Sequence, residues 1–199
     1  ASSEDDLKIT GNYVANSIIS GVEFNGDGER VDISKNFFSN NARSIWIRDS
    51  HSPVGPFFIN GNVIYNANNF DSINNPNQNP YSAINLTIWF SDFVQVYLYN
   101  NYIESDRCFY GATYTGAENI YALNNVFNCR RSLGNDTYYT TLEEHPNGSG
   151  SLSFLHKNKQ ALFSGNFFGG VKDTRTNLDY VLDSRINGSS VSFDNDYVM

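Results

Sequence analysis

Residues 57–64 read Phe57-Phe58-Ile59-Asn60-Gly61-Asn62-Val63-Ile64, and the pattern of this octet recurs along the whole chain. Counted from Asn62, apolar residues occupy positions −5, −3, +1 and +2. Position −1 is glycine, asparagine or lysine in every copy. The seven copies are residues 7–14, 31–38, 57–64, 96–103, 120–127, 161–168 and 191–198, and the last has Asp196 in place of the asparagine.

The spacing of the apolar residues predicts short β-strands. Positions −5 and −3 alternate as in a strand that buries one face, and no helical stripe lasts for more than one turn. Glycine or asparagine at −1 suits a bend in the left-handed backbone region, which these residues enter at low cost. We therefore expect an all-β fold, a parallel β-helix of about six to seven coils, with one coil for each copy.

The marked residues are separated by 24, 26, 39, 24, 41 and 30 positions. The two longest intervals contain turn-rich stretches at about residues 66–81 and 134–150, which we interpret as loop insertions. The sequence thus predicts one solenoid domain over residues 1–199. Because the copies begin at Leu7 and end at Val198, we expect a fragment of a longer chain, or ends that other chains cover.

The recurring asparagines predict an internal ladder. Successive coils of a β-helix lie about 4.8 Å apart, so equivalent side chains stack and an amide can donate to one neighbour while accepting from the other. This structural role accounts for the asparagines without any catalytic function. The ladder residues are Asn12, Asn36, Asn62, Asn101, Asn125 and Asn166.

Composition excludes some classes of partner. Thirteen Lys and Arg against 21 Asp and Glu leave a net charge of −8, which argues against a nucleic-acid binder. No apolar run reaches the length of about 20 residues that a membrane span needs, so we expect no membrane insertion. Two cysteines, Cys108 and Cys129, are too few for a disulfide framework, and we interpret them as small buried apolar residues.

The repeated octets resemble the right-handed parallel β-helix of the pectate-lyase-like superfamily, and the resemblance covers residues 7–198. That superfamily includes polysaccharide lyases, glycoside hydrolases and phage tailspike depolymerases. The low charge, abundant aromatic residues and long polar insertions are most similar to a tailspike. The resemblance implies a homotrimer on a virion tail, or a secreted protein, that attaches to bacterial surface polysaccharide. No catalytic motif of the superfamily is recognisable in the sequence.

Outward positions of the repeat gather aromatic residues. Positions −4 and −2 point away from the coil, and in copies three to five they hold Phe58, Tyr97, Tyr99 and Tyr121. Exposed aromatic surface indicates a partner. Sugar rings stack on aromatic faces, so we interpret this patch as a carbohydrate-binding surface, and an interface with an insertion or another subunit is the equal alternative.

A second aromatic column is expected on the following strand. Residues 44–49 and 87–92 align as Ser-Ile-Trp-Ile-Arg-Asp with Thr-Ile-Trp-Phe-Ser-Asp, which places Trp46 beside Trp89. Phe109 follows in the next coil, and all three side chains are expected to point outward and bind sugar. Packing beneath the 66–81 insertion is the alternative.

Four carboxylates are the catalytic candidates: Glu104, Asp106, Asp49 and Asp92. The same alignment stacks Asp49 and Asp92 one coil apart, at roughly the carboxylate spacing of retaining glycosidases. Arg48 and Arg107 are candidates for holding a substrate carboxylate, or are counter-ions of these acids. The three histidines lack the spacing of a metal site, and no cofactor is expected.

These features predict a β-helix that binds and hydrolyses bacterial surface polysaccharide. Two alternatives stay open: a receptor-binding shaft without catalysis, and a polysaccharide lyase. The lyase alone would call for arginine chemistry and calcium.

Overall fold

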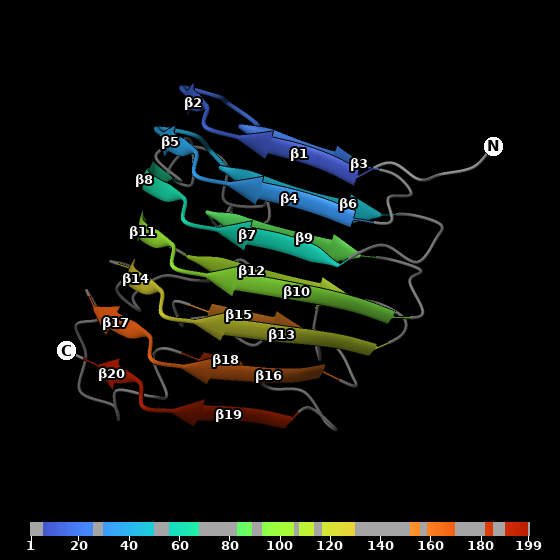
Figure 1. The fold of residues 1–199 in the computed structure, drawn as a ribbon, viewed down its shortest axis with the longest axis vertical. Coiled ribbons are helices and arrows are strands. Elements are labelled where there is room, and N and C mark those ends of the chain that lie inside the picture. The colour runs from blue at the N-terminus through green and yellow to red at the C-terminus, as the bar shows by residue number, and fades with distance from the viewer. Residues whose placement is uncertain are drawn as a thin grey trace, which may run out of the picture.

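The computed structural model describes residues 6–25, 30–49, 56–67, 83–88, 93–105, 108–113, 117–129, 152–155, 159–169, 182–184 and 190–198. Over these residues the protein is all-β, and every strand pairing is parallel. The chain passes through three sheets in turn and returns to the first, so the structure is a parallel β-solenoid, as predicted (Figure 1). No helix that could span a membrane occurs in this described part.

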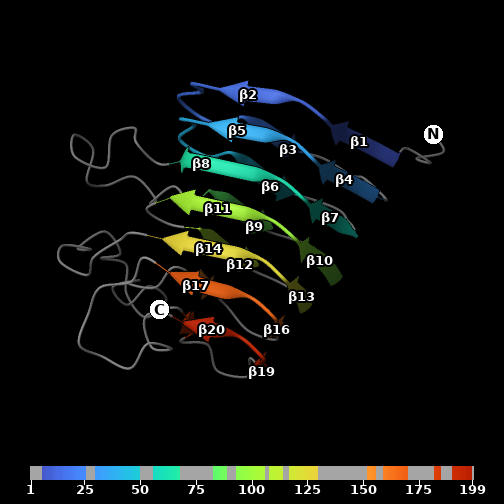
Figure 2. The same ribbon diagram turned by 60° about the vertical axis from the view of Figure 1, so that its left-hand side comes forward.

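We call each passage of the chain through the sheets a rung, and the rungs lie one above another (Figure 2). The first two sheets contain seven strands each and the third contains six, with no more than one strand from any rung in each sheet. The first sheet contains β1 (Asp6–Thr10), β4 (Arg30–Ser34), β7 (Phe57–Asn60), β10 (Phe93–Tyr99), β13 (Ala117–Leu123), β16 (Lys159–Ser164) and β19 (Ser190–Asp194). The second contains β2 (Tyr13–Ala15), β5 (Phe37–Ser39), β8 (Val63–Ala67), β11 (Tyr102–Ser105), β14 (Val126–Cys129), β17 (Phe167–Gly169) and β20 (Tyr197–Val198). The third contains β3 (Val22–Asn25), β6 (Ile45–Asp49), β9 (Ile84–Ile88), β12 (Phe109–Thr113), β15 (Leu152–Leu155) and β18 (Leu182–Ser184).

A left-handed residue joins the first sheet to the second in all seven rungs, which confirms the predicted bend. The residue before each ladder position has φ between 54° and 71°. Six of the seven are glycine or asparagine, which adopt this left-handed conformation at low energetic cost. The exception is Lys35, with φ of 57°. The bend turns the chain so that the ladder residue points inward.

The asparagine ladder is continuous, and it is buried from Asn36 to Asn166. Asn101 donates its backbone N–H and its side-chain amide to Oδ1 of Asn125, at 3.0 and 2.9 Å. Its amide also donates to the Ile59 carbonyl of the preceding rung, at 2.8 Å. The same three bonds recur at Asn36, Asn62, Asn125 and Asn166, and the last of these donates to Asp196. Because each amide is saturated, polar groups are buried here without loss of stability.

A shorter polar stack lies at the next corner and was not predicted. The backbone N–H of Ser17 donates to Oδ1 of Asn41 at 2.9 Å, and Nδ2 of Asn41 donates to the Val14 carbonyl at 3.0 Å. This geometry repeats that of the main ladder. Asn41 is fully buried.

Between the sheets, the inward side chains form one apolar core. Val31, Phe57, Val96 and Ile120 stack in the first sheet, in the register that the octets predict. Burial of aliphatic and aromatic side chains supplies the main stabilisation of such a stack. The predicted insertions at 66–81 and 134–150 lie almost entirely outside the described residues.

Candidate functional site

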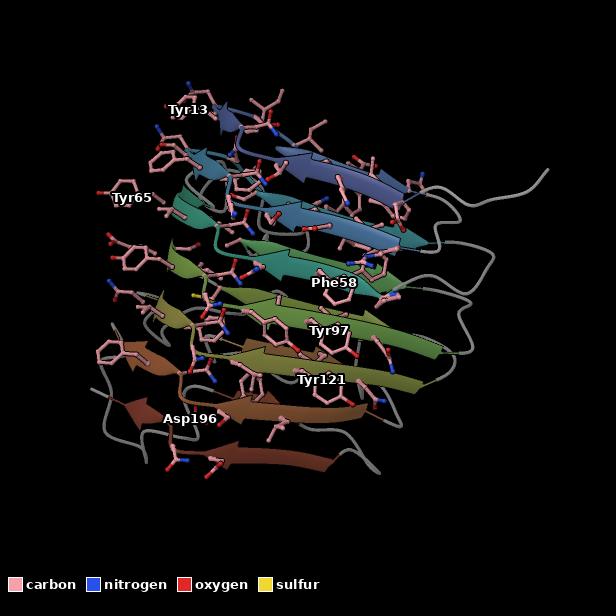
Figure 3. All side chains as sticks on the ribbon, in the orientation of Figure 1. Tyr13, Phe58, Tyr65, Tyr97, Tyr121 and Asp196 are labelled. Atoms are coloured by element: carbon pink, nitrogen blue, oxygen red, sulfur yellow. The ribbon has the colours of Figure 1, made fainter. Side chains whose placement is uncertain are left out.

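Three aromatic rings form a stack on the outer face of the first sheet (Figure 3). Phe58 and Tyr97 lie with their ring centroids 5.0 Å apart and their planes at 9°. Tyr97 and Tyr121 follow at 5.1 Å and 13°. These three residues occupy one register column of β7, β10 and β13, as the sequence predicted.

The stacking covers part of the face of each of the three rings. A centroid separation of 5.0 Å is larger than that of two rings stacked directly face to face. The two parallel rings are therefore offset and overlap only in part. The guanidinium of Arg30 lies 4.8 Å from the Phe58 centroid and adds a cation–π contact at that end of the stack. All three side chains are half-buried, and Tyr97 has a parallel ring on each side.

Tyr99 extends the patch sideways. Its ring is tilted by 55° against Tyr97, with centroids 5.7 Å apart. Burial, and then the neighbouring phenols of Tyr97 and Tyr121, raise the pKa of Tyr99 above its usual value of 10.0. The phenol therefore stays protonated at neutral pH and is a hydrogen-bond donor at the side of the stack.

Amide side chains border the stack. Gln95 and Asn119 pair in register next to Tyr97 and Tyr121, and the Tyr97 hydroxyl donates to Oε1 of Gln95 at 3.2 Å. On the other side, Asn100 donates to Oδ1 of Asn60 at 3.3 Å. The outer face of the first sheet thus combines aromatic surface with neutral donors and acceptors, the combination that sugars bind.

The predicted tryptophan column is wrong in its register. Trp46 pairs with Asn85, and Phe109 pairs with Ile84 at the level of the buried Ile45. Trp89 lies outside the described residues. The prediction matched Ile-Trp-Ile to Ile-Trp-Phe by residue type, whereas the strands pair the apolar residues Ile84 and Leu86 with Ile45 and Ile47.

Trp46 instead packs against a charged neighbour from its own rung. The guanidinium of Arg43 lies 3.8 Å from the Trp46 ring centroid, and Arg43 is only 9% exposed. The tryptophan therefore shields a cation, which is a structural role. A part in sugar binding by Trp46, Trp89 and Phe109 stays a prediction.

The predicted pairing of Asp49 with Asp92 is also wrong, because Asp49 lies opposite Ile88 in the next rung. Arg48 lies opposite Thr87. Asp92, Asp106 and Arg107 lie outside the described residues, so the structure brings no two of the four catalytic candidates together within its described part. Their catalytic roles stay predictions.

Glu104 is placed on β11 at the outer surface of the second sheet but is only 8% exposed. The hydroxyl of Tyr102 donates to its Oε2 at 2.8 Å. This hydrogen bond orients the carboxyl group of Glu104.

A second exposed apolar column runs down the second sheet and was missed. The residue after each ladder position is apolar in all seven copies, and these residues pair in register from β2 to β20. Tyr13 and Phe37 stack at 5.5 Å and 10°, and Tyr13 is 72% exposed. The sequence signal was present in the octet itself, at position +1.

The cysteines depart from their predicted role in one respect. Cys108 is fully buried, as expected, but it is disulfide-bonded. The sequence holds one other cysteine, Cys129, which closes β14. A framework needs more than two cysteines, but a single disulfide bond does not, so the cysteine count alone does not exclude one.

Within the described ranges, no group of three or more His, Cys, Asp or Glu side chains is placed to hold a metal ion.

No family model, no curated protein and no solved structure matches this chain.

Proposed function

We propose that this protein binds a polysaccharide along the outer face of its first sheet. The observation that carries the proposal is the stack of Phe58, Tyr97 and Tyr121 between amide side chains. Sugars offer C–H surface to aromatic rings and hydroxyls to amides, and a stack that repeats with the rungs offers repeated contacts to a repeating chain. Arg30, beyond Phe58, adds a cation at one end.

The proposed ligand is a bacterial surface polysaccharide, and the proposed location is a virion tail or the outside of a cell. The disulfide of Cys108 supports a location of this kind, because such bonds persist in oxidising surroundings and at virion surfaces. A homotrimer is proposed with it, and the apolar column from Tyr13 to Phe167 is surface that subunits would cover.

Cleavage of the bound polysaccharide is the finer part of the proposal. Among the residues that the structure describes, Glu104 is the best catalytic candidate, because the hydrogen bond from Tyr102 fixes the orientation of the Glu104 carboxylate. A hydrolase loses activity in Glu104→Gln without loss of binding. A protein that binds but never shortens its ligand is the shaft of the alternative interpretation, and an unsaturated product would identify a lyase.

The binding proposal is tested with capsule and O-antigen preparations immobilised as a panel. Replacing Tyr97 removes the central ring of the stack, which contacts Phe58, Tyr121 and Tyr99, so Tyr97→Ala should weaken binding about tenfold or more. Tyr65→Ala is the matched control, because Tyr65 is an exposed tyrosine (40%) on the second sheet. Equal binding by both variants, or no binding by the intact protein across the panel, would refute the proposal.

A further inference from the structure

The aromatic stack lies on a stretch of the first sheet whose outer face is uncharged (Figure 3). Beside the three stacked rings, β7, β10 and β13 present half-buried outward side chains that are amides, a phenol and a leucine. Those that the structure describes are Asn60, Gln95, Tyr99, Asn119 and Leu123. A ligand on this stretch therefore exchanges water for neutral polar groups and aromatic surface, with no cation among these side chains.

The charged residues of the same face lie beyond the stack, and they oppose one another. In β1 and β4, Asp6 pairs with Arg30 and Lys8 pairs with Asp32, so each base lies beside an acid of the neighbouring rung. At the other end of the sheet, the exposed Asp194 on β19 adds a further acid. Among the described side chains of these strands, positive charge is therefore not in excess.

From this distribution of charge we infer that the polysaccharide bound at this face is neutral, without carboxylate, phosphate or sulfate groups. The inference rests on the proposed function, whose ligand it narrows. An anionic group that loses water against uncharged side chains pays a free-energy cost that only a cation partner offsets, and proteins use Arg and Lys for that purpose.

Two further properties favour uncharged sugars. A hydroxyl group both donates and accepts hydrogen bonds, as do the amides of Gln95 and Asn119, whereas a carboxylate only accepts. The net charge of −8 on the whole chain also repels a polyanion, most strongly at low ionic strength.

The charge of the ligand bears on the reaction as well. A polysaccharide lyase abstracts a proton that a neighbouring carboxyl group acidifies. A neutral polysaccharide has no such carboxyl group, so the inference favours hydrolysis, or binding without cleavage, over elimination.

The first experiment measures the affinity of the full chain for each member of the capsule and O-antigen panel. The tightest-binding member should be neutral, and its affinity should change less than about twofold between about 50 and about 500 mM salt. Part of its primary hydroxyl groups is then oxidised to carboxylates. The oxidised polysaccharide should bind about tenfold more weakly or worse than its parent.

A charge variant shows whether this loss arises at the first sheet. Asn119→Lys places a cation beside Tyr121 and should recover about fivefold or more of the affinity for the oxidised polysaccharide. The matched control is Asn128→Lys, because Asn128 is a half-buried asparagine of the same rung on the second sheet. The control carries the same net charge and should recover less. Gln95→Lys replaces Asn119→Lys if that variant does not fold.

The outcomes separate this inference from the proposed function. Binding of an acidic member that Tyr97→Ala weakens would overturn the inference and leave the proposed function standing. Equal binding of the parent and oxidised polysaccharides, or equal recovery by the two lysine variants, would also overturn the inference alone. Absence of binding to every member would refute the proposed function, and the inference with it.

Discussion

Asn62 donates both its backbone N–H and its side-chain amide to the single oxygen Oδ1 of Asn101, at 3.0 Å in each case. The two residues are 39 positions apart in the sequence, yet their side chains are fully buried and in contact. The ladder therefore fixes the vertical register of rungs even where a long stretch of chain intervenes, because a slip of one residue would bury amides without partners.

Asn101→Ala should be strongly destabilising. The change leaves the two donors of Asn62 without an acceptor and the Ile59 carbonyl without a donor. Each buried unsatisfied group costs about 1–3 kcal/mol, so the free energy of unfolding should fall by about 3 kcal/mol or more. Denaturant unfolding measures it. Asn12→Ala, at the exposed end, should cost about 1 kcal/mol or less, and a similar loss in both variants would contradict the account.

Lys35→Gly should stabilise the protein. Lys35 is the only one of the seven bend residues that is neither glycine nor asparagine, and its φ is 57°. The left-handed conformation costs a side-chain-bearing residue about 1–2 kcal/mol, of which the greater entropy of unfolded glycine offsets part, leaving a gain of about 0.5–1 kcal/mol. The matched control is Lys8→Gly, in the middle of β1, which should lose about 0.5–1 kcal/mol. Shifts of the same sign in the two urea midpoints would argue against strain at Lys35.

The first sheet could be predicted residue by residue, and the third could not. In the first, each strand is tied to a ladder residue a few positions away, so the octets fix the pairing of Phe58, Tyr97 and Tyr121. In the third, the strands are separated from the preceding ladder residue by corners of variable length. Only for β6 and β9 does counting back from the next ladder residue give the observed pairing, since Trp46 precedes Asn62 by as many residues as Asn85 precedes Asn101.

The chemistry of the site was less predictable than its position. The sequence indicates which aromatic residues share a column, but the offset overlap of their rings depends on side-chain packing between rungs. The low exposure of Glu104 and the disulfide of Cys108 likewise depend on contacts between residues that no repeat aligns.

Reduction of the Cys108 disulfide should lower the thermal midpoint. A disulfide bond restricts the unfolded chain and typically contributes about 2–4 kcal/mol to the free energy of unfolding. Wild-type protein should therefore melt at a lower temperature in the presence of a thiol reductant. Cys108→Ser should melt low in both conditions, with no response to the reductant. Free thiols in the oxidised wild-type protein, counted by alkylation and mass spectrometry, would disprove the bridge.

Alkaline pH should weaken the fold through Tyr99. Burial, with the neighbouring phenols of Tyr97 and Tyr121, raises the folded pKa of Tyr99 above the unfolded value of 10.0. The contribution to stability is complete below pH 10.0, because both states are then protonated, and it is lost as the pH rises through the folded pKa. The free energy of unfolding is measured across this pH range for the wild type and for Tyr99→Phe. Because the two proteins share all other titrating groups, the difference between them isolates the effect of Tyr99. The wild type should lose more stability than the variant. Identical slopes, together with tyrosinate absorbance that appears at the same pH in folded and unfolded protein, would place Tyr99 in open solvent.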